Sequence, residues 1–127
     1  MALTICLPLP PSVNHIWRHA RGRTFLSKNY TQWIQRAQVA LMCQFCKPCK
    51  WHGPLEVHIE ARRGKGWDSR KRDLDNMAKP VLDFLVREGL IPADDHTVIQ
   101  RVVIELGPGT SPEAEVVVSV RHYGEEA

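Results

Sequence analysis

Alternating apolar and polar positions predict a strand near the middle of the chain. Between Leu55 and Ala61 every second residue is apolar, and the residues between them are Glu56, His58 and Glu60. Neighbouring side chains of a strand point to opposite faces of a sheet, so this pattern is typical of a strand with one buried face. Three further segments, rich in apolar and β-branched residues, are also predicted to be strands: 2–9, 98–106 and 114–120.

Apolar residues that recur every three or four positions predict two helices. The first covers residues 28–46, with Ser27 as its N-cap and Pro48 as its stop. Its apolar stripe consists of Tyr30, Ile34, Ala37, Leu41 and Phe45. The second helix begins after Asn76, a suitable cap, and ends before Gly89. Its stripe consists of Leu74, Met77, Ala78, Val81, Leu82 and Leu85.

The order of these elements predicts an α+β fold. Strand, loop, helix, strand, helix, strand and strand follow one another without an internal repeat or a linker, so we expect a single domain over residues 1–127. Two basic segments, 15–23 and 62–72, are expected as loops, the first of them alternatively as a ragged hairpin. The expected architecture is a small mixed β-sheet with two main helices packed on one face.

Charge is distributed unevenly along the chain, although the net charge is only +3. Residues 1–72 hold 13 basic and 3 acidic side chains, and residues 73–127 hold 4 basic and 11 acidic ones. The two parts therefore carry net charges of +10 and −7, with the change of sign between Arg72 and Asp73. Such asymmetry indicates a polyanionic partner such as nucleic acid.

The remaining composition excludes several classes of protein. With 43% hydrophobic and 24% charged residues the chain is unlike a disordered protein, and its apolar stretches are too short to span a membrane. The first eleven residues lack the basic start and the cleavage site of a signal peptide. Four cysteines in such a chain are expected to be free thiols, and the protein is expected in the cytoplasm.

The strongest chemical signal is the pair of carboxylates at Asp73 and Asp75. In an extended segment they would point to the same side, where a hard cation such as Mg²⁺ would relieve their repulsion. Lys79, four residues further on, would stand one helical turn along and could hold a phosphate or stabilise developing charge. Asp94 and Asp95 are a second acidic pair, one of which could be a third ligand.

Each of these residues also has a purely structural interpretation. Acids before a helix often serve only as caps or as partners of the helix dipole. Asp94 and Asp95 follow Pro92, which is typical of a turn, and Asp83 could simply form an ion pair with Lys79. The sequence context favours a catalytic role for these acids over a structural one, because six basic residues directly precede the carboxylates. That combination suits a place where a metal ion meets a polyanion.

Two Trp-bearing basic segments are the candidates for contact with DNA. Trp67 is predicted to be exposed and to stack on unpaired bases, whereas Trp17 could equally lie in the core or in a dimer interface. The basic candidates, which would bind phosphates largely through counterion release, are Arg18, Arg21, Arg23, Arg62, Arg63, Lys65, Arg70, Lys71 and Arg72.

Three regularly spaced cysteines and a histidine form a separate candidate. Cys43, Cys46, Cys49 and His52 have the spacing C-x2-C-x2-C-x2-H, which could coordinate Zn²⁺. Ligands this close together rarely surround one tetrahedral ion, and Pro48 interrupts the series. We therefore interpret these cysteines as free thiols.

Three blocks of this sequence resemble the RusA family of Holliday junction resolvases. Residues 70–83, RKRDLDNMAKPVLD, are similar to the family's basic run, D-L-D-N motif, lysine and helical aspartate. Residues 9–14 (LPPSVN), with 17–19 (WRH), resemble its N-terminal block, and residues 94–98 (DDHTV) resemble its late D-D-x-x-V block. The blocks occur in family order and extend over most of the chain.

The resemblance implies a RusA-like fold and a homodimeric, Mg²⁺-dependent endonuclease that resolves four-way DNA junctions by paired nicks, with Mn²⁺ as a substitute ion. It places the catalytic, metal-binding aspartates at Asp73, Asp75 and Asp95 and the essential lysine at Lys79. Asp94 is the competing third ligand, because loop lengths before this pair vary. The cysteines lie outside the family pattern.

Two other functions compete with this one. A non-catalytic protein that binds branched DNA would need the basic segments but would have no use for three acids beside the DNA. A metal-dependent nuclease with another branched or single-stranded substrate would need both the basic segments and the acids. The complete set of acids and the lysine therefore favours an enzyme.

Overall fold

A four-stranded mixed sheet forms the body of the protein. The computed structural model describes residues 2–11, 17–20, 23–44, 51–67 and 74–124. The sheet has the strand order β1 (Ala2–Pro8), β6 (Glu115–His122), β4 (Leu55–Lys65) and β5 (Ile99–Glu113). Strands β1 and β4 pair antiparallel with β6, whereas β4 and β5 are parallel and are joined by a crossover that contains α2. The predicted mixed sheet is confirmed.

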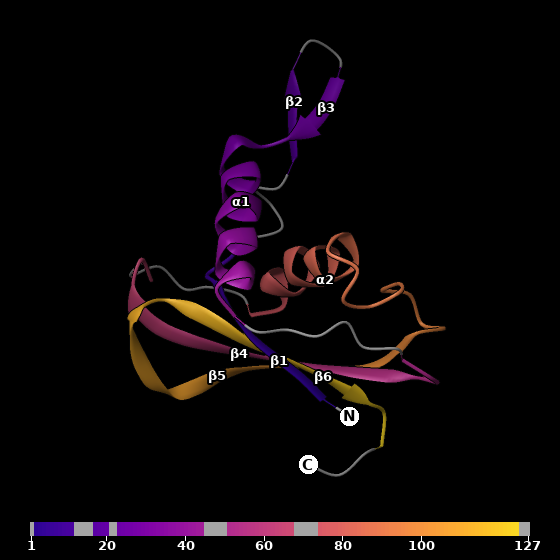
Figure 1. The fold of residues 1–127 in the computed structure, drawn as a ribbon. Helices are drawn as coiled ribbons and strands as arrows, with labels where there is room; N and C mark the ends of the chain where they lie inside the picture. The colour runs from indigo at the N-terminus through magenta and orange to yellow at the C-terminus, as the bar shows by residue number, and fades with distance from the viewer. Residues whose placement is uncertain (1, 12–16, 21–22, 45–50, 68–73, 125–127) are drawn as a thin grey trace.

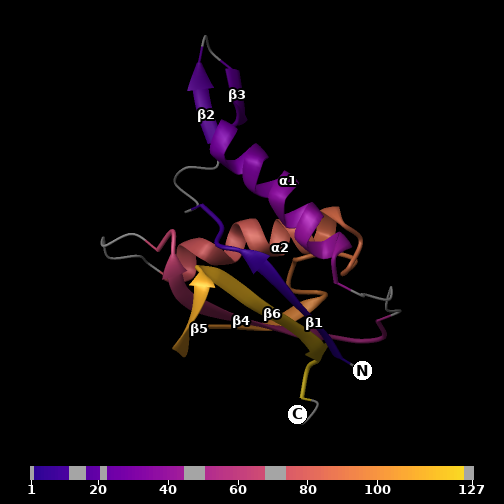
Figure 2. The same ribbon diagram turned by 60° about the vertical axis from the view of Figure 1, so that its left-hand side comes forward.

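Both helices pack on the same face of this sheet (Figures 1 and 2). They are α1 (Lys28–Met42) and α2 (Ala78–Arg87), and a short 3₁₀ turn, η2 (Leu74–Met77), precedes α2. Side chains from every second position of the strands fill the space between sheet and helices; they include Leu3, Ile5, Leu7, Leu55, Val57, Ile59, Val116, Val118 and Val120. The predicted α+β class and the placement of both helices on one face are therefore confirmed.

A separate hairpin formed by β2 (Trp17–Ala20) and β3 (Arg23–Leu26) projects beyond the N-terminal end of α1, away from the sheet (Figure 1). Figure 2 shows the same projection from another direction. The basic segment 15–23 was expected as a loop or hairpin, and its described residues, 17–20 and 23, belong to the two strands of a hairpin. The hairpin is therefore an arm that stands apart from the core.

The helix ends confirm some of the predicted caps and correct one. Ser27 caps α1, since its hydroxyl oxygen accepts from the backbone N–H of Tyr30 at 3.1 Å. Gly89 ends α2 in the left-handed conformation, with φ 72°, and the N–H of Leu90 donates to the carbonyl of Leu85. The prediction that Asn76 caps the second helix is wrong. That residue lies inside η2, and the N-cap position of α2 is Met77, which makes no side-chain cap hydrogen bond.

Strand pairing extends two elements beyond their predicted ends. Residues 62–65 were expected in a loop, but they continue β4, and Lys65 pairs with Glu113 of β5. The strand predicted at 98–106 continues through residues 107–109 to Glu113, and Pro108 is tolerated there because β5 is an edge strand. A Cβ atom at Gly107 would come within 2.7 Å of the Glu60 carboxylate, so a larger residue there would require the Glu60 side chain to move.

A side chain covers part of the opposite edge of the sheet, which is formed by β1. The amide of Gln44, just after α1, accepts from the backbone N–H of Cys6 and donates to its carbonyl, both at 2.7 Å. An amide that makes this pair of bonds occupies the place of a neighbouring strand residue, and it shields part of the β1 edge from further strand addition.

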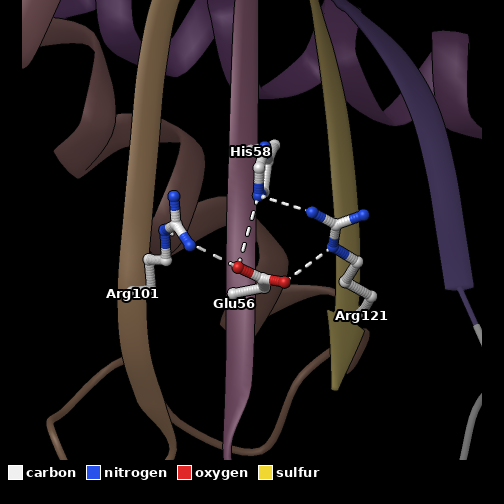
Figure 3. A network of polar contacts seen from close by, with 4 residues as sticks. All are labelled: Glu56, His58, Arg101 and Arg121. Carbon is white, nitrogen blue, oxygen red and sulfur yellow. Dashed lines mark hydrogen bonds and ion pairs between the residues drawn. The ribbon is translucent and has the colours of Figure 1, made fainter. Parts of the chain in front are cut away.

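A buried carboxylate lies on the sheet face that the helices leave uncovered. Glu56 is only 2% exposed, although it is on the polar side of the alternating strand. Its carboxylate accepts from Arg121 Nε at 2.7 Å and lies 3.8 Å from Arg101 Nε and 3.4 Å from His58 Nε2 (Figure 3). Burial alone would raise the pKa of Glu56, but the hydrogen bonds from Arg121 and His58 outweigh it and lower that pKa.

We expect Glu56→Gln to lower the melting temperature at neutral pH, because two arginines lose their buried counter-charge. A depressed carboxyl pKa contributes stability above its unfolded value and loses it as pH falls. The difference between parent and variant should therefore shrink below about pH 4. Thermal unfolding from pH 3 to pH 8 measures this, and a difference that grows on acidification would contradict it.

Candidate active site and DNA-binding surface

The first turn of α2 and the turn before β5 meet at Lys79. Its ammonium donates to Asp83 Oδ1 at 3.0 Å, one helical turn along, and lies 3.6 Å from Asp94 Oδ2. The hydrogen bond to Asp83 is the main cause that raises the pKa of Lys79, against a smaller effect of burial. Lys79 therefore carries its full charge at neutral pH, and it joins two of the sequence blocks described above.

The acidic pair before β5 divides its contacts. Asp94 faces Lys79, whereas Asp95 Oδ1 accepts from the backbone N–H of Thr97 at 2.9 Å and also from the Thr97 hydroxyl. The carbonyl of Asp95 accepts from the N–H groups of Val98 and Ile99 at 3.0 and 2.9 Å. These hydrogen bonds, first of all that from the Thr97 hydroxyl, lower the pKa of Asp95. A turn is therefore present after Pro92, but it begins at Asp95, and Asp94 directly precedes it.

Asp75 lies at the start of the helical segment, exposed to solvent in η2. The side-by-side placement of Asp73 and Asp75 was predicted for extended backbone, and that premise is wrong for Asp75, which is helical. Asp73 lies outside the described residues. The structure therefore brings Lys79 to Asp94 and leaves the convergence of the predicted metal ligands Asp73, Asp75 and Asp95 as a prediction.

The donors at this site are of one chemical kind. Asp75, Asp94 and Asp95 all offer carboxylate oxygens, the ligands that a hard divalent ion such as Mg²⁺ prefers. Among the described residues, no three acidic, histidine or cysteine side chains are already gathered as a metal site. The donor set therefore fits Mg²⁺ in its chemistry.

The predicted DNA contacts at the end of β4 differ in their surroundings. Arg63 and Lys65 are exposed, but Arg62 is ion-paired with Glu60 at 3.1 Å and Glu115 at 3.7 Å. Trp67 was predicted to be exposed; it is half-buried and packs against the core. Lys65 is the last residue of β4.

The other predicted DNA contacts lie on the hairpin or outside the described residues. Trp17 and Arg18 belong to β2, and Arg23 belongs to β3. Outside the described residues are Arg21, Arg70, Lys71 and Arg72. The arm and the end of β4 are therefore the two described places where the predicted basic residues are found.

The cysteine series is described only at its ends. Cys43 is an exposed free thiol at the C-terminal end of α1, and His52 is exposed. Cys46 and Cys49 lie outside the described residues.

No helix in the described ranges is both long and apolar enough to cross a bilayer.

Comparison with known proteins identifies the family. The family described as Endodeoxyribonuclease RusA matches residues 8–120. A protein of Shigella sonnei named crossover junction endodeoxyribonuclease RusA is 35% identical over 107 residues, which cover 79% of this chain and 80% of that protein. The protein of the same name in Escherichia coli K12 is 34% identical, again over 79% of this chain and 80% of that protein. The one in Enterobacteria phage 82 is 35% identical over 78% of this chain and 79% of that protein. The chain therefore belongs to the RusA family of endodeoxyribonucleases.

Proposed function

We propose that this protein is an Mg²⁺-dependent, structure-selective endodeoxyribonuclease that resolves four-way (Holliday) junctions by paired nicks during DNA recombination and repair. The observation that carries the proposal is the contact of Lys79 with Asp94, which lie 15 residues apart in sequence and 3.6 Å apart in space. It joins the D-L-D-N block to the D-D block, as a shared site requires. The names of the relatives, crossover junction endodeoxyribonucleases, support a DNA junction as the substrate.

Four side chains would form the reacting centre. Asp73, Asp75 and Asp95 would hold Mg²⁺, with Mn²⁺ as a substitute and Asp94 as the competing third ligand. The bound ion would supply an activated water and stabilise charge on the phosphoryl oxygens. Lys79, held by Asp83, places a permanent positive charge beside the acids and would hold a phosphate oxygen of the DNA.

The proposed assembly is a homodimer of single-domain chains acting in the cytoplasm, where bacterial and phage DNA is processed. A two-fold axis would give two identical sites, which suits a junction of near two-fold symmetry and paired nicks. The hairpin arm and the basic residues from Arg63 to Arg72 would contact the DNA arms. Arg62, in its two ion pairs, would take part once those pairs open.

A non-catalytic protein that binds branched DNA remains the second candidate. The basic arm and segment favour it as much as they favour the nuclease. The acids beside Lys79 distinguish the two, because carboxylates next to a DNA surface weaken binding unless they hold a cation. The nuclease is therefore the better supported function.

We expect purified protein to cut an end-labelled four-way junction symmetrically in two opposed strands when Mg²⁺ is present. With EDTA the junction should be bound but left intact, and a linear duplex of the same sequence should be cut far less. Denaturing gels of each labelled strand measure the nicks. Binding without nicks at any divalent ion concentration would favour the non-catalytic candidate.

A further inference from the structure

The exposed face of α1 is basic and rich in amides. Lys28, Asn29, Gln32, Gln35 and Arg36 are all exposed on this helix. Residues 28–42 contain no aspartate or glutamate, and the first acid of the whole sequence is Glu56. A face that combines arginine, lysine and side-chain amides has the donors that proteins use to contact DNA phosphates.

A small cavity joins this face to the end of β4. It has a volume of about 280 Å³ and is lined on one side by Asn29, Gln32 and Arg36 and on the other by Lys65. Trp33 also lines it; this residue is 2% exposed, and its Nε1 donates to the carbonyl of Pro8 at 2.8 Å. Pockets for drug-sized ligands begin at roughly 300 Å³. The cavity is therefore large enough for a small polar group, and it is lined in part by a buried, hydrogen-bonded side chain.

The charges around the cavity favour an anion. Arg36 and Lys65 supply two cations from different elements, and Glu113, which is exposed at the rim, supplies one acid. Asn29 and Gln32, on the same helix as Arg36, add neutral hydrogen-bond donors. The lining therefore keeps one net positive charge at neutral pH, together with donors on both sides of the opening.

The cavity is also continuous with the proposed DNA surface. Lys65 and Gly66 line it and stand at the start of the basic segment that runs to Arg72, directly before the acids of the proposed active site. On its other side, α1 follows the hairpin arm directly in the chain (Figure 2). The α1 face therefore lies between two places already proposed to contact DNA.

We propose that the α1 face, anchored at Arg36, is an additional DNA-contacting surface, and that the cavity between Arg36 and Lys65 takes a backbone phosphate of one junction arm. The inference rests on the proposed function and extends it to residues with no DNA motif of their own. Arg36 would act as a positioning residue for the DNA arm, without touching the scissile phosphate. Sequence-independent contact of this kind adds to affinity and to its dependence on salt.

Arg36→Gln tests the proposal, with Arg87→Gln as the charge-matched control on an exposed residue at the end of α2. Binding of a fluorescent four-way junction is measured by anisotropy in EDTA, as NaCl is varied. We expect Arg36→Gln to weaken binding about five- to tenfold and to reduce the salt slope by about 1. Arg87→Gln should change neither, and Arg36→Lys should keep the slope because it keeps the charge.

A double variant, Lys71→Ala with Arg72→Ala, separates the inference from the proposed function. If that variant loses affinity while Arg36→Gln binds as the parent does, the α1 surface is wrong and the junction nuclease stands. If the parent binds a junction no better than a linear duplex, the proposed function itself fails. If Arg36→Gln changes the sedimentation of the protein but not its DNA binding, the face is an interface between copies and the inference is overturned.

Discussion

Asp75→Asn is expected to reduce the nicking of a four-way junction by at least about a hundredfold, the scale of loss when a group that stabilises transition-state charge is removed. The residue is exposed in η2, the 3₁₀ turn that precedes α2, so the protein should fold and melt as the parent does. Junction binding in EDTA should be retained or slightly stronger, because one negative charge near the DNA is removed. Single-turnover cleavage and anisotropy measure the two effects.

Glu88→Gln is the matched control for Asp75→Asn. It removes a carboxylate that lies directly after the same helix, at the opposite end from Lys79, where it accepts a hydrogen bond from Gln38 at 3.4 Å. Its cleavage rate should stay within about twofold of the parent's, since it lies outside the residues proposed to bind metal or DNA. Asp75→Asn cleaving as fast as Glu88→Gln would remove Asp75 from the proposed metal site.

Trp33→Ala is expected to destabilise the fold by about 3–5 kcal/mol, the usual cost of deleting a large buried aromatic. Trp33 is 2% exposed and connects three elements. Its ring meets Phe84 of α2 edge-on, with centroids 5.6 Å apart, and lies parallel to Tyr30 at 6.0 Å. Its indole N–H donates to the carbonyl of Pro8. Such a loss is a large part of a typical stability of about 5–15 kcal/mol.

Trp33→Phe separates packing from hydrogen bonding at this position. It keeps an aromatic ring beside Phe84 but leaves the carbonyl of Pro8 without the indole donor, which costs about 1–2 kcal/mol. Urea unfolding of the three proteins measures both differences. Equal losses in the two variants would assign the role of Trp33 to its hydrogen bond alone.

Local patterns predicted the parts of the fold that depend on neighbouring residues. Ser27 and Gly89 were recognisable because capping requires one short side chain or one residue that tolerates positive φ. The extension of β4 to Lys65 was not recognisable, because it depends on pairing with β5, nearly fifty residues later. The burial of Glu56 has the same cause, since the arginines that cover it come from β5 and β6.

The candidate site divides in the same way. The i,i+4 spacing of Lys79 and Asp83 allowed for an ion pair, which was the structural alternative for Asp83, and the structure contains it. The approach of Asp94 to Lys79 has no local signal, because it depends on how the crossover returns to the sheet. The residue types alone suggested Asp94 or Asp95 as a third ligand, and the family resemblance supported joining the two blocks. The amide-rich face of α1 contains no recognisable motif. Its proposed contact with DNA was inferred from the cavity that it shares with Lys65.

The parallel pairing of β4 and β5 has a consequence for folding. Parallel neighbours need a crossover, and here the crossover runs from Gly66 to Val98, so it contains η2, α2 and every acid proposed for catalysis. Closing a loop of this length costs chain entropy before any β4–β5 contact repays it. The reacting centre should therefore form late and together with the sheet. A partly folded chain, already basic enough to bind DNA, would then be unable to cut it.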